Sequence, residues 1–365
     1  MKRIDIRPFL PDNLSRMKQT FALTLGAVLL ALPAFSLQVS AQNAADPFYG
    51  DWEGTVKYNG KTQQVAVCMI PLGNNNYEAR FFKEFGKQDD PLFFITGQIK
   101  DSSAKFINHD AFSFDNVKYD TQDGIVLDAT LWTGEVKNNT LKGKLGGKDK
   151  GIFDLKKTLR TSPTMGKAAP EGARILFDGT EASKENFLDN GTKNSIRWEL
   201  KDNGALEVNG GDIIPKKGFN DCVMHIEFRS PYYPDRFGQA RGNSGVYING
   251  AYEIQVLDSY GLPGLDNDCA GIYQIQRPAV NVCFPPDYWQ TYDIDFTMPR
   301  FDADGKKTAN ARLTLLHNGV KVYDNLELPH ATPGAINPGE RDQVGLLLQD
   351  HGDKVQYRNI WVLEK

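Results

Sequence analysis

Short stretches in which hydrophobic and polar residues alternate follow one another along the chain, and turn-forming residues separate them. Alternation with a period of two is typical of β-strands that bury one face, and no segment shows a convincing helical period. The predicted strands of the first half span residues 54–58, 64–68, 77–81, 124–128 and 141–145. Those of the second half span residues 197–200, 205–208, 222–229, 244–248, 252–257, 291–298, 311–316, 320–323, 344–349 and 355–362. The pattern therefore predicts an all-β protein.

The two groups of strands are separated by residues 161–172, a stretch of small residues with proline and glycine that is typical of a linker. We therefore predict a small all-β domain of unknown role over residues 46–160 and a second β-rich domain over residues 173–365. Because the second domain holds about ten short strands, a β-sandwich of the jelly-roll type is predicted for it.

The N-terminal residues carry the features of an export signal. Lys18 precedes an apolar stretch over residues 21–35, and Val-Ser-Ala at residues 39–41 forms a small-x-small cleavage site. Residues 1–41 are therefore predicted to be a signal peptide, and the mature protein is expected in the periplasm or outside the cell. The apolar stretch is short for a membrane span, so no integral membrane segment is expected after signal removal.

Composition is that of an ordinary globular protein. The 365 residues include 42 Lys and Arg against 46 Asp and Glu, which gives a net charge of −4, and 40% of the residues are hydrophobic. Because no domain-scale excess of basic residues is present, nucleic acid is not expected as the main partner. The sequence does not indicate an oligomeric state.

Four cysteines are present in a chain whose predicted export permits disulfides. Cys269 and Cys283 flank a short segment and are the most plausible pair. Cys68 and Cys222 lie in apolar strand patterns, which favours buried free thiols. The sequence contains no CxxC motif or Cys/His cluster that would indicate zinc.

The most informative stretch contains two predicted strands that flank Asn249 and Gly250, a pair typical of tight β-hairpin turns. In the second strand, Glu253 and Gln255 should share one face because side chains alternate. The residues between and beside them are hydrophobic and are expected to face the core. Two long polar side chains are thus predicted to line a polar cleft on the open face of the sheet.

The second domain resembles the 3-keto-disaccharide hydrolase family, through pieces that run in order through its whole length. These pieces are Ile175–Gly179, Met224–Arg229, Arg241–Val246, Tyr252–Ser259, Cys269–Tyr273, Trp289–Asp293, His317–Gly319, Leu348–Gly352 and Arg358–Ile360. The resemblance implies a concanavalin A-like jelly roll and action on glycosides whose C3 hydroxyl group has been oxidised to a ketone. It says nothing about residues 46–160.

The implied chemistry follows from the acidity of a hydrogen next to a ketone. A base removes the hydrogen on C2, the resulting enolate expels the leaving group at C1, and water then adds to give the free 3-keto sugar. Such an enzyme needs one placed base, a charge or metal ion at the enolate oxygen, and an acid for the leaving group. Two carboxylates at glycosidase spacing are not needed.

His351 is the base favoured by the sequence and by the resemblance. The unperturbed pKa of histidine lies near neutral pH, and Gly352 lets the loop approach a substrate. A hydrogen-bonded structural histidine is the alternative interpretation.

Glu253, Asp258 and Arg241 are the predicted partners of His351 as enolate or metal-binding groups. A divalent metal ion held by Glu253 and His351 is left open, with no other cofactor expected. The alternative is structural: Asp258 would cap a turn, and Glu253 would form an ordinary ion pair with Arg241.

A further set of polar and aromatic residues is predicted to bind substrate, through hydrogen bonds to hydroxyl groups or stacking on a sugar ring. This set comprises Gln255, Asn243, Glu227, Tyr247, Tyr273, Trp289 and Asn359. For the aromatic residues core packing is the alternative, and for Glu227 a cross-strand salt bridge.

Two other functions remain open at this stage. The same fold hosts non-catalytic carbohydrate-binding modules, which would bind unmodified glycans without turnover. A conventional glycoside hydrolase is disfavoured because Gln255 stands where a second carboxylate would be needed.

Overall fold

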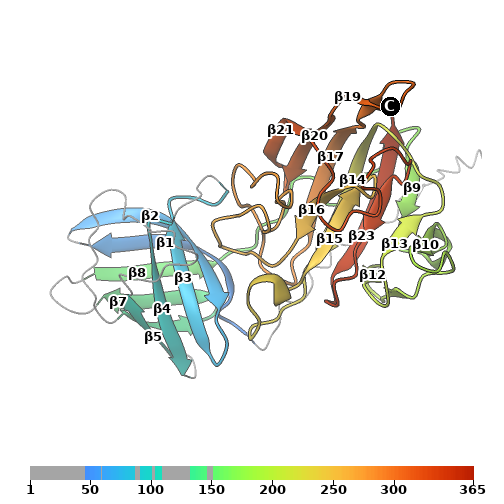
Figure 1. Ribbon diagram of the computed structural model, residues 1–365. Helices are drawn as coiled ribbons and strands as arrows, with labels where there is room; N and C mark the ends of the chain where they lie inside the picture. The colour runs from blue at the N-terminus through green and yellow to red at the C-terminus, as the bar shows by residue number, and fades with distance from the viewer. Residues whose placement is uncertain (1–45, 59, 87–90, 101–102, 109–131, 146–150) are drawn as a thin grey trace, which may run out of the picture. The chain divides into compact units, whose positions relative to one another are not determined.

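The computed structural model describes residues 46–58, 60–86, 91–100, 103–108, 132–145 and 151–365 (Figure 1). The predicted signal peptide and the predicted strand at 124–128 lie outside the described residues. Among the described residues, the regular elements are strands apart from the short helix α1 (Glu181–Lys184) and the 3-10 helix η1 (Gly238–Ala240), which confirms the predicted all-β class. None of the described helices has the length and apolar character needed to cross a membrane.

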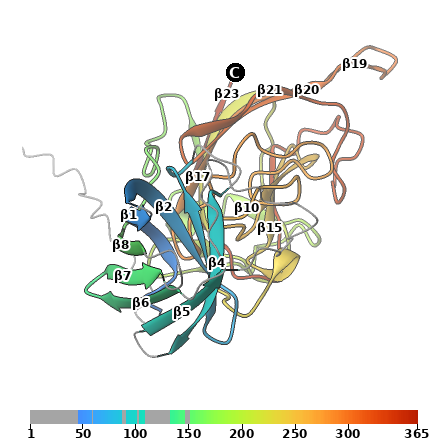
Figure 2. The same cartoon turned by 90° about the vertical axis from the view of Figure 1, so that its left-hand side faces the viewer.

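The first group of strands forms a closed antiparallel barrel in which β1 pairs with both β2 and β8 (Figure 2). Its strands are β1 (Gly50–Tyr58), β2 (Lys61–Pro71), β3 (Asn76–Phe82), β4 (Phe93–Lys100), β5 (Ser103–Asn108), β6 (Trp132–Lys137), β7 (Thr140–Leu145) and β8 (Gly151–Lys157). Closure leaves no unpaired strand edge along this sheet.

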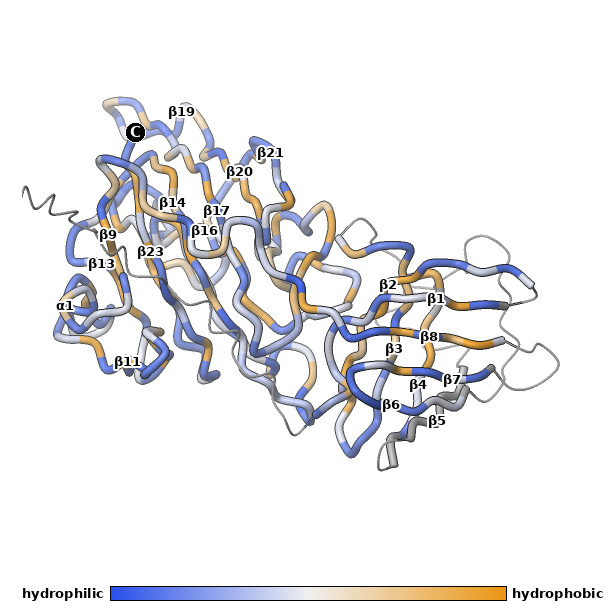
Figure 3. Tube along the Cα trace, turned by 180° about the vertical axis from the view of Figure 1, so that it is seen from behind, coloured by the Kyte–Doolittle hydropathy of each residue, from blue (hydrophilic) through white to orange (hydrophobic). Residues whose placement is uncertain are grey.

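The barrel interior is filled by apolar side chains. Buried and exposed residues alternate along β8, where Phe153 and Leu155 are buried and their neighbours are exposed. Figure 3 shows both hydrophobic and hydrophilic residues on this strand. A Cβ atom at Gly143 would lie 2.0 Å from Cζ of Phe153, so this inward position has room only for glycine. A packed interior is the usual state of an eight-stranded barrel.

The second group of strands forms a sandwich with two main antiparallel sheets. The five-stranded sheet has the order β10 (Phe187–Asp189), β13 (Ile213–Pro215), β22 (Leu346–Leu348), β15 (Ser244–Ile248) and β16 (Tyr252–Val256). The eight-stranded sheet consists of β11 (Glu199–Leu200), β12 (Leu206–Glu207), β23 (Gln356–Glu364), β14 (Cys222–Arg229), β17 (Gln290–Thr297), β20 (Ala311–His317) and β21 (Val320–Leu328), with β9 (Arg174–Phe177) paired to β23. A small hairpin adds β18 (Arg300–Phe301) and β19 (Lys307–Ala309).

The predicted hairpin is confirmed, with β15 and β16 joined through Asn249 and Gly250. Both residues have positive φ values, of 54° and 61°, as a tight hairpin turn requires. Tyr252, Ile254 and Val256 belong to the core between the sheets, as predicted. Glu253 and Gln255 consequently point from the opposite face of the five-stranded sheet.

All four cysteines are buried free thiols, so the predicted pairing of Cys269 with Cys283 is not found, whereas the predicted free thiols of Cys68 and Cys222 are confirmed. The two thiols nevertheless lie beside each other and interact through a hydrogen bond. Sγ of Cys269 lies 3.3 Å from the Tyr292 hydroxyl group, and Sγ of Cys283 lies 3.4 Å from the carbonyl oxygen of Phe284.

Candidate active site on the five-stranded sheet

Glu253 is the central residue of the polar face of the five-stranded sheet. Its position on β16 places it directly opposite Tyr247 on β15, and its backbone N–H group donates to Oγ1 of Thr332 at 2.9 Å. The side chain is only 4% exposed. Burial raises the pKa of the Glu253 carboxyl group to about 7, although a hydrogen bond with Tyr247 opposes this shift. This carboxyl group therefore changes its charge near neutral pH, as an acid–base catalyst must.

The Glu253 carboxyl group rests against the bare backbone of Gly245. A Cβ atom at Gly245 would lie 2.6 Å from Oε1 of Glu253 and 2.7 Å from Cε2 of Tyr247. Both distances are shorter than any real van der Waals contact, so a larger residue would displace these side chains. The absence of a side chain at Gly245 thus defines where the carboxyl group sits.

Gln349 joins this pair from the end of β22. Its backbone N–H group donates to the carbonyl oxygen of Gly245 at 2.9 Å, and its side-chain Nε2 donates to the Tyr247 hydroxyl group at 3.4 Å. Sequence reasoning did not select Gln349 as a site residue, although it lies in the stretch Leu348–Gly352. The signal that would have found it is its position one residue before the pair Asp350 and His351.

His351, the predicted base, is exposed on the loop after β22. The backbone N–H group of the preceding Asp350 donates to Oδ1 of Asp212 at 2.9 Å. Burial raises the pKa of Asp212, while the positive charge of His351 acts in the opposite direction. The pKa of Tyr247 is raised mainly by burial and by the charge of Glu253, and to a smaller extent by the negative charge of Asp212. His351 is therefore the solvent-exposed member of an electrostatically coupled group that also contains Asp212, Tyr247 and Glu253.

A network of amides lies beside Glu253 on the same face. Nε2 of Gln255 donates to Oδ1 of Asn243 at 3.0 Å and faces Oε1 of Gln239 at 3.3 Å. Gln255 and Asn243 are buried, and Gln239 is exposed, so the network connects the interior with the surface. Gln239 was not predicted from the sequence. Tyr273, another predicted residue, is half-buried and interacts electrostatically with Tyr247.

Arg241 and Asp258 form a buried ion pair with each other. Nε of Arg241 donates to Oδ2 of Asp258 at 2.6 Å, so the alternative ion pair between Glu253 and Arg241 is wrong. Burial raises the pKa of Asp258, and Arg241 opposes that shift. Asp258 follows the end of β16, and its carboxyl group is bound by Arg241.

Glu227, Asn359 and Trp289 lie with the eight-stranded sheet and the linker instead of beside Glu253. Oε2 of Glu227 accepts from Nε of Arg358 on the neighbouring strand at 2.7 Å, which is the cross-strand salt bridge of the alternative interpretation. Asn359 donates to Oε1 of Glu227 at 2.9 Å. The guanidinium group of Arg358 lies 4.0 Å from the centroid of the Trp289 ring. These residues were predicted from the sequence to bind substrate. In the structure, each of them contacts another residue of the protein.

The linker covers a group of buried charges on the outer face of this sheet. Oδ1 of Asp293 lies 2.9 Å from Nδ1 of His225 and 2.8 Å from Nζ of Lys167, and the N–H group of Gly166 donates to Glu227 at 2.6 Å. Burial would raise the pKa of Glu227, but His225 and Arg358 outweigh it and lower this pKa to about 2. The linker is therefore bound by carboxylates that remain ionised.

We expect the contribution of Glu227 to stability to be lost in acid. A carboxyl group whose pKa is lower in the folded than in the unfolded state stabilises the fold above the unfolded pKa, and this contribution falls as pH decreases towards the folded value. From pH 5.5 to 3 the loss should be about 2 kcal/mol. His225, whose pKa is raised by Asp293 and Glu227 against the effect of burial, stays protonated over that range.

Urea unfolding of the wild type and of Glu227→Gln, at pH 5.5 and pH 3, measures this loss as the change in their stability difference. A difference that does not change with pH would contradict the assigned ionisation of Glu227.

Metal binding has no ready-made ligand set within the part of the chain that the structure describes. No group of three or more His, Cys, Asp or Glu side chains there could hold a metal ion. A divalent ion at this site remains a prediction.

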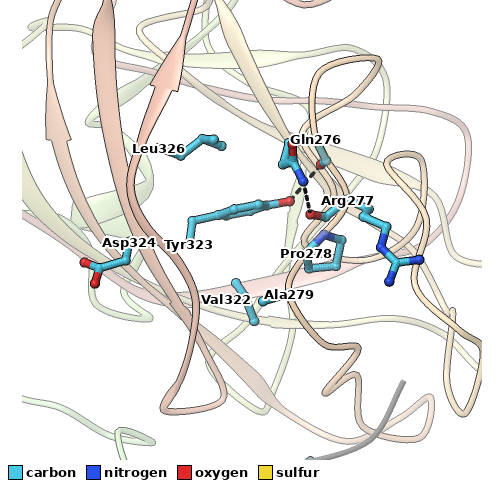
Figure 4. A pocket seen from close by; sticks show the side chains of 8 residues that line it. All are labelled: Gln276, Arg277, Pro278, Ala279, Val322, Tyr323, Asp324 and Leu326. Atoms are coloured by element: carbon cyan, nitrogen blue, oxygen red, sulfur yellow. Dashed lines mark hydrogen bonds between the residues drawn. The ribbon is translucent and has the colours of Figure 1, made fainter. Parts of the chain in front are cut away.

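A shallow pocket elsewhere in the sandwich contains none of the predicted residues. It lies between residues 276–279 and strand β21, where the Tyr323 hydroxyl group donates to the carbonyl oxygen of Gln276 at 2.8 Å (Figure 4). The side chains of Arg277 and Asp324 point away from its centre in Figure 4. The polar face around Glu253 therefore remains the candidate active site.

The whole chain is similar in part to proteins of known structure. Two crystal structures from Parabacteroides distasonis ATCC 8503, each described as "a putative glycosyl hydrolase", are similar to it. The one at 2.13 Å shares 35% identity, covers 54% of this chain and 85% of its own, and has a TM-score of 0.48. The one at 1.70 Å shares 16% identity, covers 53% of this chain and 94% of its own, and has a TM-score of 0.39. A comparison with curated proteins finds no match.

The family itself is identified by the sequence of the sandwich. Residues 172–363, more than half of the chain, match the family model described as a 3-keto-alpha-glucoside-1,2-lyase-like domain. This match confirms the resemblance found in the ordered motifs, and it indicates a carbohydrate-active protein. The chain belongs to the family of 3-keto-alpha-glucoside-1,2-lyase-like domains.

Proposed function

We propose that this protein cleaves glycosides whose C3 hydroxyl group has been oxidised to a ketone, by removal of the C2 proton and elimination at C1. Membership of the lyase-like family supports the substrate class. The single observation that carries the mechanism is the buried Glu253 carboxyl group, whose pKa is raised to about 7. A base with this pKa combines a large ionised fraction with useful basicity at neutral pH.

In the first step, Glu253 is the base. Its carboxylate takes the proton from C2, and the electron pair of the C2–H bond forms a C2=C3 double bond while the C3 carbonyl becomes an enolate. The hydrogen bond with Tyr247 holds the carboxyl group in place. The prediction that Arg241 stabilises the enolate stays a prediction; its Nη2 atom is buried and has no hydrogen-bond partner in the protein.

In the second step, the enolate reforms the ketone and a C1=C2 double bond, and the C1–O bond breaks with its electron pair on the aglycone oxygen. We assign the proton for this oxygen to His351, which lies on the solvent side of the charged group, where an aglycone can leave. Addition of water across the double bond would then give the free 3-keto sugar and a net hydrolysis.

Release of a chromogenic phenol from a 3-keto-β-glucoside tests this function, with the unoxidised glucoside and an EDTA-treated sample run in parallel. We expect release from the keto substrate alone. Release from the plain glucoside would overturn the proposal in favour of a conventional hydrolase, and binding of glycans without any release would indicate a binding module. EDTA sensitivity would add a metal ion to the mechanism.

The role of His351 is tested with the same assay and two aglycones. Because a phenolate leaves without help and an alkoxide does not, His351→Ala should slow cleavage of a methyl 3-keto-glucoside more than cleavage of the phenyl substrate. Equal losses on both substrates would contradict proton donation to the leaving group.

A further inference from the structure

One buried acceptor beside Glu253 has no partner in the protein. Oε1 of Gln349 is shielded from solvent and makes no hydrogen bond. Leaving a buried polar atom unpaired is unfavourable, and an atom of this kind beside a candidate site is explained when a bound group donates a hydrogen bond to it. A hydrogen-bond donor on the substrate would therefore satisfy Oε1 of Gln349.

The orientation of the Gln349 amide follows from the Tyr247 hydroxyl group. This hydroxyl has one proton, and both of its other neighbours, the Glu253 carboxylate and the carbonyl oxygen of Pro333 at 3.3 Å, are acceptors. The Tyr247 oxygen can therefore only accept from Gln349. The group that faces it must be Nε2, which leaves Oε1 as the free acceptor.

The free acceptor and the proposed base face the same point. The position that a Cβ atom of Gly245 would take lies 2.6 Å from Oε1 of Glu253 and 3.2 Å from Oε1 of Gln349. The carboxylate oxygen and the amide oxygen therefore both lie over the backbone of Gly245, close enough together to contact one ligand.

We infer that Oε1 of Gln349 accepts a hydrogen bond from the 2-hydroxyl group of the substrate, and so turns the C2 hydrogen towards Glu253. This inference rests on the proposed function. An amide oxygen cannot bind the C3 ketone, because both are acceptors. Among the sugar hydroxyl groups, the 2-hydroxyl shares its carbon with the hydrogen that is removed. Gln349 thereby makes the enzyme specific for 3-keto-glycosides that keep a free 2-hydroxyl group.

A cycle of two enzymes and two substrates tests this contact. The substrates are phenyl 3-keto-glucoside and its 2-deoxy analogue, which still has a C2 hydrogen to lose, and the enzymes are the wild type and Gln349→Ala. We expect the wild type to prefer the 2-hydroxy substrate, and Gln349→Ala to lose about 10- to 100-fold in kcat/KM on that substrate while changing little on the analogue. Gln343→Ala, at an exposed glutamine before β22, is the matched control and should behave like the wild type on both.

The outcomes separate this inference from the function on which it rests. If wild-type enzyme turns over both substrates and Gln349→Ala loses the same factor on each, the hydrogen bond to the 2-hydroxyl group is wrong while the function stands. If wild-type enzyme turns over neither substrate, the proposed function fails and the inference falls with it. Thermal unfolding shows whether Gln349→Ala is folded. If it is not, the wild type alone decides, because the inference fails if wild-type enzyme turns over the 2-deoxy analogue as efficiently as the 2-hydroxy substrate.

Discussion

Replacing Glu253 by glutamine is expected to reduce kcat on a 3-keto-glucoside by about 10²- to 10⁴-fold, the usual contribution of a positioned general base. Glutamine has nearly the same size and can keep a hydrogen bond with Tyr247, so folding and substrate affinity should change little. What is lost is the carboxylate that takes the C2 proton. Steady-state kinetics with the phenyl substrate, together with thermal unfolding of the variant, measure both effects.

The pH dependence of the wild type gives an independent check. Because the ionised carboxylate is the active form and its pKa is raised to about 7 by burial, kcat/KM should increase with pH up to and through neutrality and then level on this limb. Glu340→Gln is the matched control, since Glu340 is also buried and hydrogen-bonds the Tyr252 hydroxyl group. Retention of full activity by Glu253→Gln would remove Glu253 from the mechanism and return His351 to the role of base.

Replacing Gly245 by alanine should have the second largest effect, although this residue has no side chain of its own. The new methyl group would lie 2.6 Å from Oε1 of Glu253 and 2.7 Å from the Tyr247 ring, so both must shift. A displacement of about 1 Å at a reacting group can cost on the order of 10²-fold in rate. We expect kcat to fall by about that factor and stability to fall by about 1–3 kcal/mol, as in other overpacked sites.

The matched control is Gly339→Ala, because a Cβ atom at Gly339 would meet nothing within 4 Å. A purely structural role for Gly245 would lower the melting temperature and leave the pH profile of the folded fraction unchanged. Displacement of the carboxyl group should instead change its pKa, and so shift the pH at which kcat/KM rises away from pH 7. If the pH profile of kcat/KM were unshifted and kcat unchanged, the contact with Gly245 would not be needed to position the Glu253 carboxyl group.

Local features of the sequence predicted what depends on neighbours in the chain. The common face of Glu253 and Gln255 follows from alternation within one strand, and the turn at Asn249 follows from its own left-handed preference. Strand limits were also predicted where the runs are long, as in β14 and β15. By contrast, β10 and β13 have three residues each, which is too short for a period to be recognised.

The composition of the site was harder to predict because it depends on pairing between distant segments. Gln349 reaches Tyr247 only because β22 pairs with β15, about a hundred residues earlier in the chain. Arg241 and Asp258 were both selected, but which carboxylate the arginine would bind depends on how the chain continues beyond β16. Glu227 and Asn359 were selected because they are polar, and in the structure their polar groups bind the linker.

The contacts of the linker also determine how the sandwich should be isolated for experiments. The family match begins at residue 172, yet residues 162–167 cover His225, Glu227 and Asp293. A shortened protein that starts at residue 172 would expose this charged group to water and lose its partners, although it would contain every residue of the candidate active site. Expression of the sandwich alone should therefore start before Ser162, about ten residues ahead of the boundary that sequence similarity suggests.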